Sequence, residues 1–98
     1  MKAREIFNRR VPVTEHAFAE LVLWEVSEPI PGSKHRYKYR LAFVVSGECV
    51  LRYDNEAGKG DHKHAGGREV KYRFVSVDKL VADFFLDVKR WRDENSND

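Results

Sequence analysis

The chain has 98 residues, 42% of them hydrophobic and 35% charged, and its formal net charge at pH 7 is +2. This length accommodates one hydrophobic core, so we expect a single domain over residues 1–98. No apolar run approaches the ~20 residues that span a bilayer. The N-terminus lacks the apolar core of a signal peptide, and the single cysteine, Cys49, excludes an internal disulfide. These absences favour a cytoplasmic protein without a membrane partner.

The first half of the chain predicts antiparallel strands. A weaker strand is expected within residues 4–13, and a strand of β-branched and aromatic residues at 18–26. Prolines and a glycine break the chain at residues 28–33, before strand-like runs at 37–45 and 49–53. Ser46-Gly47 between these runs predicts a tight hairpin, because glycine tolerates the positive φ of such a turn.

The length of this turn decides which side chains share a face of the hairpin. A two-residue turn would place Tyr39 opposite Asp54, and strand alternation would then put Tyr37, Tyr39, Arg52 and Asp54 on one face. A slip of one residue would move half of them to the other face.

Residues 54–71 are predicted to form a long polar loop with four glycines, which is uncommon unless the loop is functional or disordered. A C-terminal helix is expected over about residues 76–92, with Ser76 as the N-cap. Its apolar stripe consists of Val77, Leu80, Val81, Phe84, Phe85, Val88 and Trp91. The predicted fold class is α+β: an antiparallel β-meander of three to four strands with one C-terminal helix packed on one face.

Several single residues have simple structural interpretations. Trp24 and Trp91 are expected in the core, and Cys49 is expected to be a small buried hydrophobe. His16 and His35 are flanked by charged residues and are expected at the surface.

Positive charge is concentrated in the middle of the chain. Residues 34–73 hold ten Lys or Arg and five Asp or Glu, which suits a surface that meets an anion, although solvated charge alone is an equal alternative. Within this stretch, residues 34–40 alternate cations with rings. Such a strand can hold phosphates on cations and stack bases on rings, as RNA-binding surfaces do. Alternatively, the two tyrosines pack on the core.

The segment from Tyr53 to His64 holds the residues best suited to chemistry. Cleavage of RNA through the ribose 2′-hydroxyl needs a base, an acid and cations that stabilise phosphoryl charge. We predict His62 and His64 as acid and base, with Asp54 or Asp61 orienting an imidazole. The predicted catalytic residues are His62, His64, Asp54, Asp61 and Lys59, and the predicted RNA- or phosphate-binding residues are Arg40, Arg52, Lys63, Lys34, Arg36 and Tyr39.

Two alternatives use the same segment differently. His62 and His64 with Asp61 or Asp54 could form a three-ligand metal site. The flanking lysines would repel a cation, and no further His or Cys pattern supports such a site, so neither a metal nor another cofactor is expected. The other alternative is a mobile basic loop whose histidines are merely solvated.

The segment Tyr53-Asp54-Asn55-Glu56-x-Gly58-Lys59-Gly60-Asp61-His62-Lys63-His64 resembles the signature of the TumE family, toxins of bacterial and archaeal type II toxin–antitoxin systems. Residues 29–33, residues 37–41 and the helix segment Leu80-x-x-Asp83-Phe84 before Trp91 match as well. The resemblance implies a toxin neutralised by a protein antitoxin, usually one with a helix-turn-helix domain. It marks Asp54, Asn55, Lys59, Gly60, Asp61, His62 and His64 as positions that the family retains.

The expected function is therefore a toxin of a type II toxin–antitoxin system that acts on RNA, as a metal-independent endoribonuclease or another inhibitor of translation. A second hypothesis is a non-catalytic module that occupies a nucleic-acid or ribosome site, for which Lys34, Arg36 and Lys38 would matter most. A metal-dependent nuclease or nucleotidyl-transfer enzyme is the third.

Overall fold

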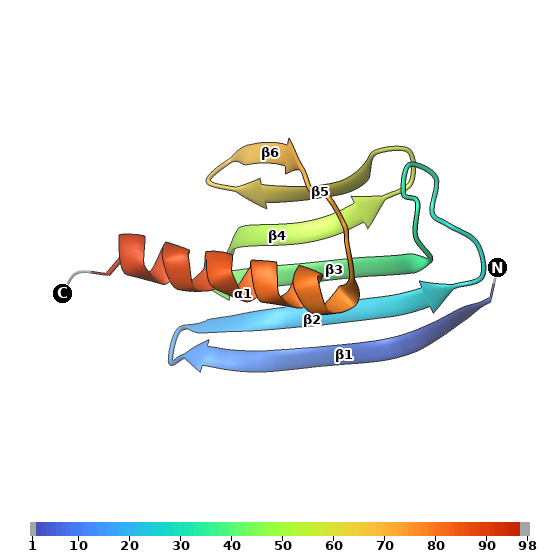
Figure 1. Cartoon of the computed structure of the whole chain (residues 1–98). Coiled ribbons are helices and arrows are strands. Elements are labelled where there is room, and N and C mark those ends of the chain that lie inside the picture. Colours follow the sequence, from blue (N-terminus) through green and yellow to red (C-terminus); the bar gives the residue numbers. More distant parts are fainter. Residues whose placement is uncertain (1, 97–98) are drawn as a thin grey trace.

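A computed structural model describes residues 2–96 of the chain. Over these residues the chain forms β1 (Ala3–Thr14), β2 (Ala17–Val26), β3 (Tyr37–Val45), β4 (Glu48–Glu56), β5 (Gly60–Ala65), β6 (Arg68–Lys71) and α1 (Val77–Glu94). The strands pair antiparallel in chain order, and α1 lies across one face of the sheet (Figure 1). The α+β meander with its C-terminal helix is confirmed, but the sheet has six strands rather than three to four.

The expected loop over residues 54–71 is wrong, because this segment is the end of β4 followed by two further strands. The β4–β5 and β5–β6 turns use glycines at positive φ, such as Gly58 (φ 86°) and Gly67 (φ 77°). Residues of β5 are polar on both faces, so no apolar alternation marks them as a strand. Their backbones nevertheless pair with β4 over the whole of β5, and residues 62–65 also pair with β6.

A β-bulge in the β3–β4 hairpin changes the predicted register. The pairing shifts by one residue and leaves Val50 without a residue opposite, so Asp54 lies opposite Arg40 rather than Tyr39. The predicted common face of tyrosines, Arg52 and Asp54 is therefore wrong. Tyr39 points towards α1, whereas Arg52 and Asp54 project from the other face.

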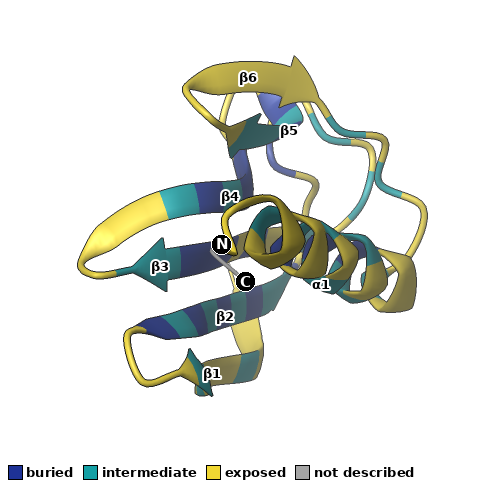
Figure 2. Cartoon of the chain, turned by 90° about the vertical axis from the view of Figure 1, so that its left-hand side faces the viewer, coloured by how far each residue is buried: buried dark blue, intermediate teal, exposed yellow. Residues whose placement is uncertain are grey.

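The hydrophobic core lies between α1 and the sheet. Ser76 caps the helix as predicted, with its Oγ accepting from the Lys79 N–H at 3.1 Å. The apolar stripe is confirmed, with Leu80, Phe84 and Val88 buried. Figure 2 shows the buried residues, in dark blue, mainly in the central strands β2, β3 and β4, whereas the outer side of α1 is exposed. Each buried side chain of this size contributes roughly 1.5–3 kcal/mol.

Polar contacts fix the helix at one position over the sheet. The Tyr53 hydroxyl donates to the Asp87 carboxylate, to which Lys63 Nζ also donates at 3.1 Å. The Tyr72 hydroxyl donates to Asp83 at 2.7 Å and, together with Lys79, holds the pKa of the Asp83 carboxyl below its usual range. These contacts join α1 to β4, to β5 and to the chain that follows β6.

Three expectations about buried residues have mixed outcomes. Trp91 is half-buried against the core, edge-on to Phe43 at 5.6 Å between ring centroids. Cys49 is exposed beside the hairpin turn, contrary to prediction. Trp24 is half-buried on the sheet face away from α1 and does not join the main core.

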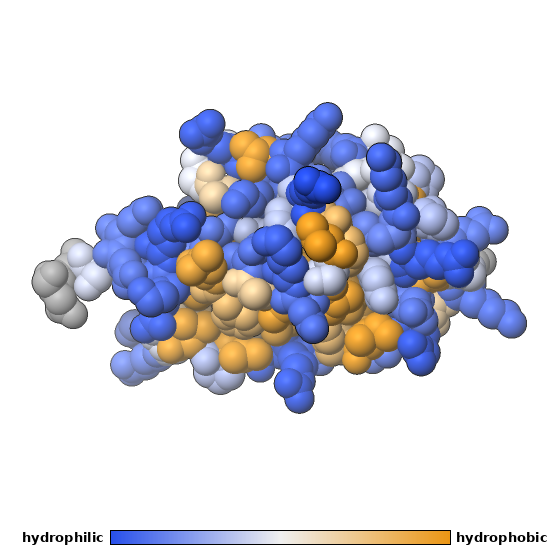
Figure 3. Space-filling model, viewed as in Figure 1, coloured by the Kyte–Doolittle hydropathy of each residue, from blue (hydrophilic) through white to orange (hydrophobic). Residues whose placement is uncertain are grey.

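The surface on the helix side carries apolar side chains among charged ones (Figure 3), and Val75 and Leu86 are 59% and 55% exposed. Of the part of the chain that the structure describes, no helix has the length and apolar character needed to cross a membrane.

The loop between β2 and β3 packs directly on the β4–β5 turn. The Gly58 N–H donates to the Pro31 carbonyl at 2.7 Å, and a Cβ on Gly60 would lie 2.6 Å from the Gly32 carbonyl oxygen. This close approach requires glycine and holds the loop against the start of β5.

We expect Gly60→Ala to destabilise the chain more than Gly58→Ala does. Both glycines have positive φ (76° and 86°), but a Cβ on Gly58 would meet no atom within 4 Å. The shared backbone strain costs about 1–2 kcal/mol, and only Gly60→Ala adds a clash with backbone. Urea unfolding measures both variants, and equal losses would contradict the packing of this loop.

Candidate functional site

Strand alternation divides the segment from Asp54 to His64 between the two faces of the sheet. Asp54, His62 and His64 project from the face opposite α1, here called the open face. Residues that pair across adjacent strands project to the same face, and Asp54 pairs with His62 while His64 pairs with Arg52. Asn55 and Asp61, which pair with each other, project to the helix side. The site is therefore a surface of β4 and β5 and not a loop.

Cross-strand pairing arranges the open-face side chains in rows. One row runs from β3 to β6 through Arg40, Asp54, His62 and Lys71. The next row runs through Arg52, His64 and Glu69. Residues opposite one another in antiparallel strands lie close enough for their side chains to touch. The predicted residues Asp54, His62, His64, Arg40 and Arg52 are brought together in this way.

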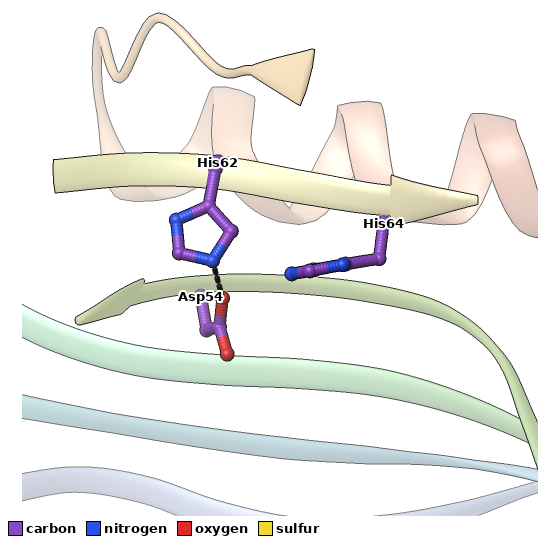
Figure 4. A group of neighbouring side chains, drawn as sticks. All are labelled: Asp54, His62 and His64. Atoms are coloured by element: carbon purple, nitrogen blue, oxygen red, sulfur yellow. Dashed lines mark ion pairs between the residues drawn. The ribbon is translucent and has the colours of Figure 1, made fainter. Parts of the chain in front are cut away.

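Asp54, His62 and His64 form a compact cluster, drawn in Figure 4. One nitrogen from each imidazole and one Asp54 oxygen lie within 4.8 Å of one another. His62 Nε2 is 2.7 Å from Asp54 Oδ1, and the His62–His64 ring centroids are 5.0 Å apart. Asp54 and His62 are only 8% and 3% exposed, so the cluster is largely shielded from water although it lies on the open face.

Neighbouring charges border this cluster. Arg52 Nε is 3.0 Å from Asp54 Oδ2 and leaves Oδ1 for the histidines. Glu69 Oε1 lies 3.7 Å from His62 Nε2, and Lys59 donates to the same carboxylate at 3.2 Å. This hydrogen bond holds the pKa of the Glu69 carboxyl below its usual range. Lys59 thus meets the cluster only through Glu69.

The match to a known family covers almost the whole chain. The family model Toxin TumE matches residues 3–92. The chain belongs to the TumE toxin family. Membership implies a toxin of a toxin–antitoxin system with an antitoxin as its partner. No curated protein and no solved structure matches the chain.

On the helix side of this TumE chain, Asp61 is a structural anchor and not a member of the cluster. Its carboxylate accepts from Ser33 Oγ at 2.6 Å and from the Tyr39 hydroxyl at 2.7 Å, and it contacts His35 Nε2 at 2.6 Å. His35 is consequently not the surface residue expected, since its side chain is 14% exposed and its ring stacks on Phe74 at 3.8 Å. Asp61 and Tyr39 are thus separated from the predicted site.

Asn55 completes the same anchor from β4. Its side chain accepts from the Tyr39 N–H at 3.0 Å and donates to the Tyr37 carbonyl at 2.7 Å. It is 1% exposed. The amide satisfies backbone groups at the start of β3, which fixes the loop before that strand.

The remaining predicted cations are scattered. Lys63 lies on the helix side, paired with Asp87. Lys34 lines a groove of about 640 Å³ together with Lys59, Lys71 and Arg73. Arg36 lies elsewhere, in a hollow formed with the N-terminal end of β1. Lys59 connects this groove to the cluster through its ion pair with Glu69, and Lys71 does so through its position opposite His62.

Two residues of the site were not predicted from the sequence. Glu69 was missed because β6 was not recognised, so nothing placed it opposite His64. Trp24 was assigned to the core, but it lines a pocket of about 190 Å³ with Arg40 and Asp54. The alternation of β2, which sends Leu23 inward, could have revealed its outward direction.

We expect Asp61→Ala to lower the free energy of unfolding by about 3 kcal/mol, because it leaves the buried Tyr39 hydroxyl and its neighbours without a partner. His64→Ala, at a side chain that is 29% exposed, should cost less than about 1 kcal/mol. Chemical denaturation of both variants tests this. A larger loss for His64→Ala would contradict the division into anchor and site.

Burial, and then the hydrogen bond to Asp61, raises the pKa of Tyr39 well above its usual value of about 10. Because the folded state holds this proton more tightly, the protonated Tyr39 hydroxyl adds to the free energy of unfolding. This contribution is complete below about pH 10 and is lost as the pH rises further. Urea unfolding between about pH 9 and pH 11 should therefore show a falling free energy, with a shallower fall in Tyr39→Phe. Identical slopes would contradict the assignment.

Proposed function

We propose that this TumE chain is a toxin that acts on RNA, with Asp54, His62 and His64 at its reaction centre. The observation that carries the proposal is the convergence of these three side chains on an open sheet surface beside arginines. RNA cleavage needs proton transfer or a Lewis acid next to cations that hold the phosphate. Proton transfer by His62 and His64, as the sequence predicts, is one way in which the cluster can carry the reaction.

Cations for the RNA backbone flank the cluster along the row from β3 to β6. Arg40 and Lys71 stand at the two ends of this row, and Lys38 lies two residues before Arg40 on the same face of β3. Within residues 2–96 none of these three has an ion-pair partner, so their charge is available to a phosphate. Free cations on both sides of Asp54 and His62 can hold the phosphates of a nucleic-acid backbone that crosses the cluster.

The pocket beside Asp54 supports a single-stranded ligand. It is lined by Trp24, Lys38 and Arg40 and measures about 190 Å³, close to the size of a single base. Indole rings stack on any base, and the stacking is worth roughly 1–3 kcal/mol. A nucleotide held there would have its phosphate next to Arg40 and its ribose near the cluster.

The antitoxin partner is part of the same proposal. A helix-turn-helix antitoxin, as the family resemblance suggests, would neutralise the toxin by binding it.

A non-catalytic module that occupies a nucleic-acid or ribosome site is the second candidate. Lys34, Arg36 and Lys38 are all exposed, and the loop that carries the first two is held rigidly by Asp61 and Asn55. A rigid, exposed basic loop can bind a polyanion without any chemistry.

Induced expression without the antitoxin, followed by growth and total RNA, tests the two functions. We expect the wild-type chain to arrest growth with fragmented RNA, and Asp54→Asn and His64→Ala to abolish both effects. With purified protein, cleavage should fall at least about 100-fold, the usual contribution of a positioned acid or base. His16→Ala, at an exposed turn histidine, is the matched control and should behave as wild type.

Arrest by all these variants with intact RNA would refute the RNA-cleaving proposal. If charge reversal at Lys34, Arg36 and Lys38 then removed the arrest, the binding module would be the function.

A further inference from the structure

We infer that Asp54, His62 and His64 bind a divalent transition-metal ion of the Zn²⁺ class. One ligand atom from each of the three residues lies within 4.8 Å of the other two, on two adjacent and fully paired strands. Ligands of one ion bound at about 2.0–2.2 Å are separated by roughly 3 Å or slightly more. The three atoms are therefore already close to the spacing that one bound ion would require.

The atoms that converge are those left without hydrogen bonds. Among the described residues, Asp54 Oδ1, His62 Nε2 and His64 Nε2 are all buried and lack a hydrogen-bond partner; the neighbouring Arg52 Nε is the fourth such atom. The 2.7 Å contact between Oδ1 and His62 Nε2 does not have the geometry of a hydrogen bond. Buried polar atoms that remain unsatisfied are rare and costly, and a shared cation satisfies all three at once.

The other atoms of these side chains are held as ligands of a metal usually are. His62 Nδ1 lies 3.0 Å from the Gly60 carbonyl, which can only accept, so Nδ1 carries a proton and, in the neutral ring, the lone pair is on Nε2. Asp54 Oδ2 forms an ion pair with Arg52 Nε at 3.0 Å, without the geometry of a hydrogen bond, while Oδ1 faces His62. A backbone carbonyl behind a ligating histidine is a usual outer contact of a metal site.

The sequence argument against a metal relied on lysines next to the histidines, and the structure places both of these lysines away from the ligand atoms. Lys63 lies on the helix side, with its ammonium 3.1 Å from Asp87. Lys59 is paired with Glu69 at 3.2 Å, and that carboxylate lies within 4.0 Å of both histidine Nε2 atoms. The cations that remain beside the cluster are Arg52, which pairs with Asp54 Oδ2, and Arg40 and Lys71 at the two ends of the row. The potential at the cluster is therefore set by carboxylates as well as by cations.

The donor set selects the class of ion. Two imidazoles and one carboxylate suit Zn²⁺ and its first-row neighbours, whereas Mg²⁺ and Ca²⁺ prefer oxygen ligands. Three protein ligands leave a coordination position for water, which is the arrangement of a catalytic site and not of a structural one. The chemical role of the ion rests on the proposed function: beside Arg40 and Arg52 it would act as a Lewis acid for a phosphate.

Metal binding can be measured without reference to RNA. The untagged full-length chain is freed of metal with a chelator, dialysed and titrated calorimetrically with Zn²⁺, Co²⁺ and Mg²⁺. We expect one Zn²⁺ or Co²⁺ per chain and no binding of Mg²⁺ in the same concentration range. Co²⁺ should also produce visible d–d absorption, which reports directly on its ligands.

Matched variants assign the site. Asp54→Asn and His64→Gln keep the side-chain volume and leave the 3%-exposed His62 unchanged. Each variant should lower the affinity for Zn²⁺ at least tenfold. His16→Gln removes an exposed histidine elsewhere and should bind as wild type. Circular dichroism confirms that each variant is folded. A wild-type chain that takes up no ion, or folded Asp54→Asn and His64→Gln variants that bind as tightly as wild type, would overturn the inference.

The same samples separate this inference from the proposed function. A chain that binds one ion but leaves RNA intact would refute the RNA-cleaving proposal and keep the metal site. A metal-free chain that cleaves RNA at the full rate and takes up no ion would refute the metal site and keep the RNA-cleaving proposal.

Discussion

The alternation of side chains along the β4–β5 hairpin is the constraint on which the rest of the structure depends. Residues two apart in a strand share a face, so one short polar segment supplies two different surfaces. Asp54, His62 and His64 meet on the open face, while Asn55 and Asp61 meet on the helix side. A shift of one residue in the pairing would exchange the two sets of side chains. The two histidines and Asp54 would then lie under the helix, and Asn55 and Asp61 would lie on the open face.

The two sets support each other through the thickness of the sheet. On the helix side, Asn55 and Asp61 hold the loop before β3 through backbone and hydroxyl hydrogen bonds. Tyr53 and Lys63 hold α1 through Asp87. Because these contacts immobilise alternate residues of both strands, the intervening open-face side chains have little freedom. A rigid frame of this kind is what a site with closely spaced groups requires.

Ion pairing decides which of the many cations can act on a ligand. Lys59, Lys63 and Arg52 each meet a carboxylate, so their charge is largely compensated. Arg40, Lys38 and Lys71 lie on the open face without such a partner among residues 2–96. The basic middle of the sequence therefore becomes a narrower band of free charge beside the cluster. This band, and not the total of ten bases in residues 34–73, is the surface that would meet an anion.

The sequence by itself determined the elements with a clear apolar period, the strand at Tyr37–Val45 and the capped helix, and also the family, through one long polar motif. It also grouped His62 and His64 with either Asp54 or Asp61, without deciding between the two carboxylates. Only the tertiary structure decided the rest. The bulge at Val50 determined which face of the sheet each β4 side chain occupies. The strand β5 was not predicted because a strand that is polar on both sides has no apolar alternation. Asp61 became an anchor because its partners come from a loop some 25 residues away. These outcomes depend on pairing between distant strands, which local residue patterns do not encode.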